Sequence, residues 1–182
     1  MTHSILIKDQ TVSKDVSAYN RSVVSGSTST DIDNGNVFLL QTRGTSGSNI
    51  EAWVFSPCIA GSMIGLWMAA SPEVPITVDG DLIYKGLNQD PRKFYNVGGK
   101  VFDAFKPQPG DIITLTADAL DSGTAQAFAN ASAGAFTLVW AANPVATTTF
   151  SLRYLATTYI SIGSGGIDNQ RVTAFKFEVL YN

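Results

Sequence analysis

From residue 36 onward the sequence is divided into short β-prone runs, and this division limits the fold more than any other feature. The runs cover residues 36–42, 50–56, 62–70, 75–84, 112–116, 136–140, 148–157 and 172–181. Clusters of Gly, Pro, Asn, Asp and Ser separate them, and such clusters are typical of turns between strands. Short runs at a spacing of roughly ten residues predict an all-β chain of about nine or ten strands.

Alternation within the runs indicates antiparallel strands with one buried face. Phe175, Phe177, Val179 and Tyr181 fall on one face of the last run, which is the pattern of a half-buried strand. Asp79-Gly80 lies between two β-prone runs and predicts a tight hairpin. The expected architecture is an antiparallel β-sandwich, a jelly-roll or Ig-like variant, with a barrel as the other solution. The alanine-rich residues 116–135 are expected to form a loop with one short helical turn.

The first 35 residues differ in composition from the rest. Residues 17–36 are dense in Ser, Thr, Gly, Asn and Asp, which favour turns and extended chain. We therefore expect residues 1–35 to form an extended N-terminal arm that needs a partner surface, and residues 36–182 to form the β-sandwich domain. A solvated tail is the alternative interpretation of the arm.

Charge and composition exclude several classes of protein. The chain of 182 residues carries a net charge of −3, with 15% charged residues and no cluster of Lys or Arg. A nucleic-acid binder needs a basic surface, so that class is not expected. No apolar run is long enough for a membrane helix, and the first residues lack the pattern of a signal peptide. The single cysteine, Cys58, cannot form an intrachain disulfide and is expected to be a buried thiol.

The sequence offers no recognisable catalytic set, so we expect a protein that is not an enzyme. His3 is the only histidine and lies in the predicted arm, which excludes Ser-His-Asp and multi-His zinc sites from the body of the fold. Asp31-Ile-Asp33-Asn-Gly35 is interpreted as a polar turn, because its register is one residue short of a calcium loop. Carboxylate pairs drawn from Asp103, Asp111, Asp118 and Asp121 stay formally possible, but each lies at a turn or strand start. No catalytic, cofactor or metal residue is predicted.

Aromatic residues are the remaining candidates for recognition. Trp53, Trp67 and Trp140 lie in apolar strand contexts and are expected in the core. Tyr84 and the pair Phe94-Tyr95 border turns, where exposed rings suit either sugar stacking or a protein interface. The low charge and high apolar share, 45%, favour the interface.

Three segments resemble small decoration, or cement, proteins of tailed-phage heads. They are Leu66–Glu73, Thr77–Asn88 and Phe102–Thr116, the last with its Pro-Gly-Asp turn before a β-prone run. The resemblance implies a noncatalytic virion protein, homotrimeric in many relatives, that is assembled in the host cytoplasm. It would bind the outer surface of a shell built from a major capsid protein of the HK97-like fold. It implies no cofactor.

The expected function is therefore capsid decoration and stabilisation, without contact with nucleic acid or membrane. Ile5, Leu6 and Ile7 form a short apolar run in the predicted arm, and we expect them to anchor the arm on the capsid by adding a strand to a neighbouring sheet edge. The alternatives are a carbohydrate-binding β-sandwich module and a head-fibre or tail adhesin, either of which would gather exposed aromatic side chains on one face.

Overall fold

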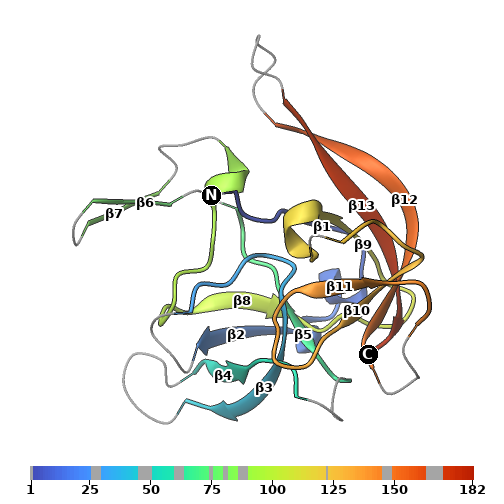
Figure 1. Ribbon diagram of the computed structural model, residues 1–182. Helices are drawn as coiled ribbons and strands as arrows, with labels where there is room; N and C mark the ends of the chain where they lie inside the picture. The colour runs from blue at the N-terminus through green and yellow to red at the C-terminus, as the bar shows by residue number, and fades with distance from the viewer. Residues whose placement is uncertain are drawn as a thin grey trace.

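The computed structural model shows an all-β protein made of two sheets and a separate hairpin (Figure 1). It describes residues 2–25, 30–44, 51–59, 64–73, 76–79, 82–85, 90–121, 123–144, 149–162 and 170–182. All but one of the strand pairings between these residues are antiparallel. The all-β, antiparallel expectation is thus confirmed.

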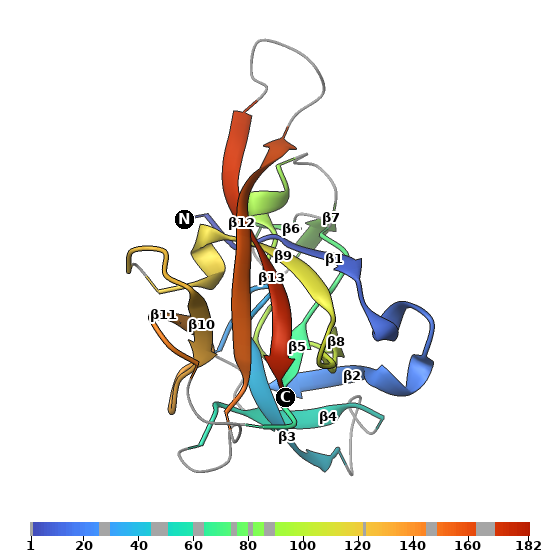
Figure 2. The same cartoon turned by 90° about the vertical axis from the view of Figure 1, so that its right-hand side faces the viewer.

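The larger sheet has six strands and carries the longest elements of the fold. Across the sheet, the order is β1 (Leu6–Gln10), β9 (Ile112–Thr116), β13 (Gln170–Tyr181), β12 (Ser151–Ile162), β10 (Phe128–Ala131) and β11 (Leu138–Ala141). β12 and β13 are 12 residues each and pair along their whole length. Their far ends rise above the rest of the molecule in both side views (Figures 1 and 2).

The other five-stranded unit closes on itself. Its strands are β2 (Asn20–Ser25), β4 (Trp53–Ser56), β3 (Val37–Arg43), β5 (Trp67–Ala69) and β8 (Phe102–Phe105), and together they form a closed barrel. β2 pairs with β4 in parallel on one side and with β8 in antiparallel on the other, and these two pairings complete the ring. Jelly-roll and Ig-like sandwiches are therefore not confirmed, because one of the two expected sheets closes into a barrel.

A two-stranded hairpin and four short 3₁₀ helices complete the described structure. The hairpin joins β6 (Ile76–Asp79) to β7 (Leu82–Lys85), with Asp79 opposite Leu82, as the Asp-Gly signal predicted. The 3₁₀ turns are η1 (Val12–Lys14), η2 (Ser17–Tyr19), η4 (Pro91–Lys93) and η5 (Ala117–Ala119). The predicted helical turn is thus found at η5, but β10 was not predicted in that alanine-rich stretch.

One hydrophobic core joins the six-stranded sheet to the barrel, and a second fills the barrel. The joint core contains Val37, Met68 and Phe105 from the barrel strands together with Leu115 and Phe177 from the sheet. The barrel core is built on aromatic rings, among which Phe38 and Phe55 lie 4.5 Å apart. Consecutive residues of β3 and β5 enter different cores, because successive side chains of a strand point to opposite faces. β5 and the first residues of β3 are thus buried on two sides, as predicted for the run at 62–70.

The extended N-terminal arm is not confirmed. β1 pairs with β9 inside the larger sheet, and β2 is one of the strands that close the barrel. Val23 and Val24 are buried, and Ile32 lies in the barrel core. In the described part of this segment, the exposed Ser22 lies beside the buried Val23 and Val24.

The Pro-Gly-Asp turn before β9 forms as the sequence predicts. The Asp111 carboxylate accepts the backbone N–H of Gln108 at 2.8 Å and that of Val12 at 2.9 Å. One buried side chain therefore closes the turn and also ties it to the N-terminal segment, which explains an aspartate at this strand start.

Candidate functional site

The three residues predicted as capsid anchors occupy different environments. Ile5 is 3% exposed and its backbone N–H donates to Thr116 Oγ1 at 2.9 Å. Leu6 is partly buried and packs against the joint core. Ile7 is 40% exposed. Of the three, only Ile7 offers substantial apolar surface, so anchoring through all three would require β1 to leave the sheet.

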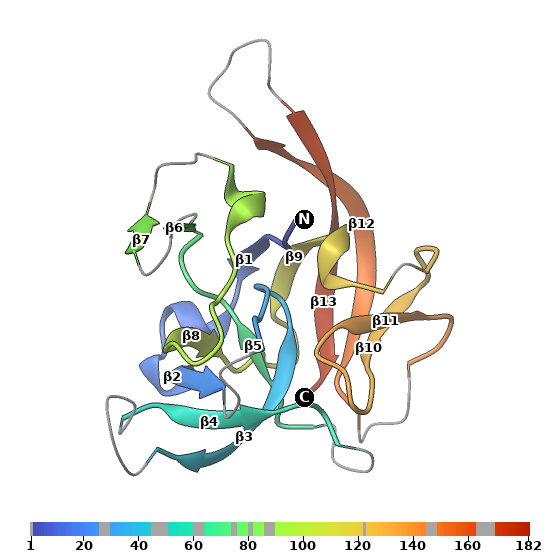
Figure 3. The ribbon, with the colours of Figure 1, turned by 60° about the vertical axis from the view of Figure 1, so that its left-hand side comes forward.

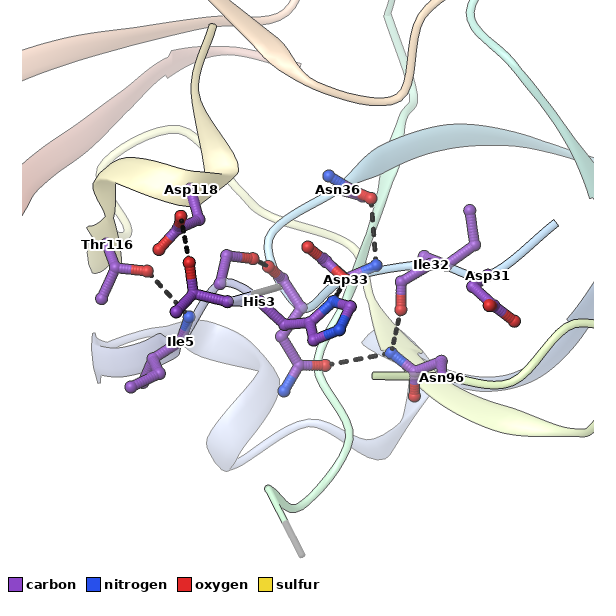
Figure 4. Close-up of polar contacts among 12 residues, drawn as sticks. His3, Ile5, Asp31, Ile32, Asp33, Asn36, Asn96, Thr116 and Asp118 are labelled. Atoms are coloured by element: carbon purple, nitrogen blue, oxygen red, sulfur yellow. Dashed lines mark hydrogen bonds and ion pairs between the residues drawn. The ribbon is translucent and has the colours of Figure 1, made fainter. Parts of the chain in front are cut away.

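Side chains from several distant segments hold the first residues in place (Figure 4). His3 Nδ1 lies 2.8 Å from Asp33 Oδ1, and its ring stacks on Tyr95 with the centroids 4.9 Å apart. Thr2 Oγ1 donates to Asp118 at 3.1 Å. The only histidine thus has a structural role near the start of the chain, beside a carboxylate and an aromatic ring.

Asn34 is the centre of a buried polar network beside this N-terminal segment. Its Nδ2 donates to the Ser71 carbonyl at 2.9 Å and to Glu73 Oε1 at 3.2 Å. Its Oδ1 accepts the N–H of Ser71 at 3.0 Å and Nδ2 of Asn96 at 3.3 Å. Asn34 therefore joins the turn at 31–35, the segment after β5 and the segment before β8.

The Asp31–Gly35 segment uses its carboxylates within the protein. Asp31 accepts the N–H of Gly98 at 2.8 Å, while Asp33 faces His3 and its N–H donates to Asn36. Gly35 follows with a φ of +88°. These contacts fit the polar turn that the sequence predicts. Among the residues that the structure describes, no group of three His, Cys, Asp or Glu side chains is placed to hold a metal ion.

A groove of about 670 Å³ lies between the outer edge of β1 and the barrel. Leu6 and Lys8 form one wall, and Asn20, Arg21 and Asp103 of β2 and β8 belong to the other. The segment after β5 contributes Glu73. The volume lies within the range of pockets that bind small molecules or peptide segments. Figure 3 shows β1, β2, β5 and β8 gathered on this side of the molecule.

The two cations of the groove lie against aromatic rings. Lys8 Nζ is 5.2 Å from the centre of the Phe105 ring, and the Arg21 guanidinium is 5.6 Å from the Trp67 ring. Within the described part of the chain, neither cation has a carboxylate oxygen within 4.0 Å. Burial lowers the pKa of Lys8, the positive charge of Lys14 lowers it further, and Asp103 acts in the opposite direction.

Glu73 lines the groove and is the more buried of its two carboxylates, since Asp103 is exposed. Its Oε1 accepts the backbone N–H of Leu6 at 2.9 Å and the side-chain amide of Asn34. Burial raises the pKa of Glu73, and the two donated hydrogen bonds partly offset this effect. The Glu73 carboxyl group thus occupies the position at the N–H of Leu6 that a carbonyl oxygen of a neighbouring strand would otherwise take.

Glu73→Gln is expected to remove one source of pH dependence from the stability. Because the native pKa of Glu73 is raised, its ionisation disfavours folding as the pH rises from the ordinary glutamate range toward neutrality. The glutamine keeps a carbonyl acceptor for Leu6 and Asn34 without the charge. Urea unfolding at pH 4 and pH 7.5 should show the variant gaining stability relative to the wild type at the higher pH. Glu51→Gln is the control: it removes an exposed carboxylate that pairs with Arg43 and should not gain stability at the higher pH. A stability difference between wild type and Glu73→Gln that stays constant with pH would contradict the account.

The distal ends of β12 and β13 form a second candidate surface, which we call the distal ribbon. It comprises Tyr159–Ile162 paired with residues 170–173, and no third strand of the described residues pairs with it. Tyr159 is 59% exposed, and Ser161, Arg171 and Thr173 are exposed as well. Leu155, also exposed, lies nearer the body on β12. The ribbon therefore exposes one large aromatic side chain, two hydroxyl side chains and one charged residue, while Ile162 in it is buried.

The aromatic candidates for sugar stacking do not form an exposed platform in the described part of the chain. Phe94 is buried and Tyr95 stacks on His3. Trp140 is in the joint core, as predicted, and Trp53 and Trp67 are half-buried against the barrel core. The side chain of Tyr84 lies outside the described residues.

Cys58 is buried, as predicted. Burial raises the pKa of its thiol to about 11, and its Sγ contacts the carbonyl of Val37. The sulfur is therefore protonated and part of the joint core at neutral pH.

Comparisons of the chain with protein-family models, curated proteins and solved structures gave no match. Among the described residues, no helix has the length and apolar character to cross a membrane.

The sequence did not point to the groove because its four charged residues come from four separate segments. Lys8, Arg21 and Glu73 each occur in an ordinary polar context. The one available signal was Lys8, a lysine within a β-prone run, which is a common feature of edge strands.

Proposed function

We propose that this chain is a noncatalytic structural protein of a phage virion that binds the outer surface of the capsid shell and stabilises it. The observation that supports the proposal most directly is the distal ribbon, which extends beyond both cores and exposes Tyr159. A two-stranded ribbon is only marginally stable by itself in water. Contact with a partner surface would bury the exposed side chains of the ribbon and so stabilise it, as is expected of a docking element.

The proposed mechanism is mechanical. Each copy would bridge neighbouring subunits of a major capsid protein of the HK97-like fold, after assembly in the host cytoplasm. Binding only to the assembled shell would favour the intact form by mass action. A homotrimer fits this role, because several weak contacts on a symmetric surface gain affinity from being linked.

The distal ribbon replaces the N-terminal arm as the main docking element of this proposal. Residues 2–5 are held by His3, Thr2 and Ile5 contacts, and β1 is a strand of the larger sheet. Freeing them would break the sheet and the polar network. Ile7 keeps a possible role, since it is exposed at the sheet edge.

The test uses capsid heads made by a phage mutant that lacks this chain, incubated with purified protein. The variant Leu155→Ser/Tyr159→Ser removes the two large exposed side chains of β12, and we expect at least a tenfold loss of affinity. Val12→Ser/Val101→Ser removes two side chains of similar exposure elsewhere and should bind as the wild type does. Binding is measured as copies per head after sedimentation.

Ile7→Ser is included to test the N-terminal anchor without removing β1. A loss with Ile7→Ser and none with the β12 variant would move docking to β1. Failure of the wild type to bind heads, together with binding to glycans or to tails, would contradict capsid decoration and favour the carbohydrate-binding or adhesin alternatives.

A further inference from the structure

The outer edge of β1 presents backbone groups that no described residue uses. Ile5 faces β9, because its carbonyl accepts the N–H of Thr116 at 3.1 Å. Backbone groups alternate along an antiparallel strand, so those of Leu6 and Lys8 point to the opposite side. The N–H of Leu6 indeed meets Glu73 there. By the same alternation the N–H of Lys8 and the carbonyls of Leu6 and Lys8 point away from β9, and no described residue outside β9 bonds to them.

These backbone groups face the groove described above, whose opposite wall is formed by the barrel. β1 contributes Leu6 and Lys8 to its lining, the same residues whose backbone groups point outward. Glu73 covers the edge at the N–H of Leu6. The edge is open to an added strand at Lys8, and the groove limits where that strand can lie. Glu73 already satisfies one outward N–H with a carboxylate oxygen, which shows that an acceptor fits at this edge.

The charged side chains of the groove indicate what kind of side chain a bound segment would carry. Lys8 and Arg21 have no carboxylate within 4.0 Å in the described structure, whereas Glu73 accepts two hydrogen bonds. Asp103 also lines the groove and is exposed to water. An acidic side chain that entered the groove would bring a carboxylate to the walls that carry Lys8 and Arg21, neither of which Glu73 or Asp103 approaches within 4.0 Å.

Protection of the sheet edge does not account for the position of Lys8. An edge lysine that blocks pairing keeps its charge in water. Lys8 instead lies over the Phe105 ring, and burial lowers its pKa. The Lys8 side chain therefore points into the groove and not into bulk water.

We propose that this groove binds an extended peptide segment of a partner protein, which adds a strand to β1 and places an Asp or Glu side chain between Lys8 and Arg21. The backbone hydrogen bonds at Lys8 would supply affinity, and the two cations would supply selectivity for the acid. The proposal goes beyond capsid decoration and does not depend on it, because its test uses peptides and the full chain alone.

The experiment selects binders from a display library of random twelve-residue peptides on the immobilised full chain. Peptides that bind the variant Lys8→Gln/Arg21→Gln are removed first. The recovered peptides should be enriched in Asp or Glu within a β-prone context. Replacing that acid by its amide should weaken binding by about tenfold or more, as measured by fluorescence anisotropy.

Two further measurements distinguish strand addition from simple charge attraction. Hydrogen exchange of the Lys8 amide should slow by at least about tenfold when the selected peptide binds. Lys100→Gln, which removes an exposed cation outside the groove, should leave the affinity unchanged. The proposal is overturned if no peptide is recovered, if the recovered peptides show no enrichment in acids, or if the Lys8 amide exchanges as before.

Discussion

Gly35→Ala is expected to destabilise the protein by about 2–5 kcal/mol. Gly35 has a φ of +88°, a conformation that costs an L-residue about 1–2 kcal/mol. A Cβ at this position would lie 2.6 Å from Cδ2 of Leu115 and 3.2 Å from Cβ of Ala119. Leu115 is fully buried in the joint core, so it has little freedom to move away. The turn at 31–35 would have to separate from the larger sheet.

Gly134→Ala is the matched control for this prediction. Gly134 has a φ of +77°, but a Cβ there would meet no heavy atom within 4 Å. The control therefore carries the backbone cost without the clash, and we expect it to lose about 1 kcal/mol. Urea unfolding of both variants measures the difference. Equal losses for the two variants would show that the turn does not pack on Leu115 as described.

Asn34→Ala is expected to cost about 2–4 kcal/mol, because it removes four hydrogen bonds at once. Asn34 is 1% exposed. Its loss leaves both backbone groups of Ser71 and the amide of Asn96 without these partners in a buried region. It also removes one of the two donors to Glu73. The network that joins three segments of the chain would then depend on water.

Gln41→Ala provides the comparison for Asn34. Gln41 also donates a side-chain hydrogen bond, to Ser56 at 2.7 Å, but at an exposed position on β3. Its replacement should change the free energy of unfolding by less than about 0.5 kcal/mol. If thermal or urea unfolding places Asn34→Ala as close to the wild type as Gln41→Ala, the polar network does not support the fold.

Local signals in the sequence predicted the elements that depend on near neighbours. The alternation of Phe175, Phe177 and Val179 identified β13, and the Asp79-Gly80 pair identified the β6–β7 hairpin. The Asp111 carboxylate closes the turn that it was expected to close. In each case the interactions that decide the structure lie within a few residues.

The closed barrel could not be predicted because it depends on pairings between distant segments. β2 pairs with β8 through Val23 and Phe102, which are about 80 residues apart in the sequence. The Ser-Val-Val-Ser sequence of β2 offers only two apolar residues, and its surroundings favour turns. β10 was missed for a different reason. Ala129 and Ala131 are buried in a tightly packed strand, where a small side chain fits. Alanine by itself favours helix, so the composition did not predict a strand.

The candidate sites were accessible to sequence reasoning only in part. Ile7 was identified as an apolar residue of the N-terminal run and is exposed, but Ile5 is buried beside Thr116. The sequence did not single out Tyr159, because nothing in it shows that β12 and β13 extend together beyond β9 and β10. The position of a strand end relative to adjacent strands is set by tertiary pairing and not by local composition.

The protein content of purified particles tests the central claim most directly. On the proposal made above, a phage encodes this chain, and virions of that phage would be purified, separated into heads and tails, and quantified by mass spectrometry. Capsid decoration predicts the chain on the heads in a fixed ratio to the major capsid protein, with its loss making the heads easier to rupture. Particles without the chain, or with the chain confined to the tails, would contradict it.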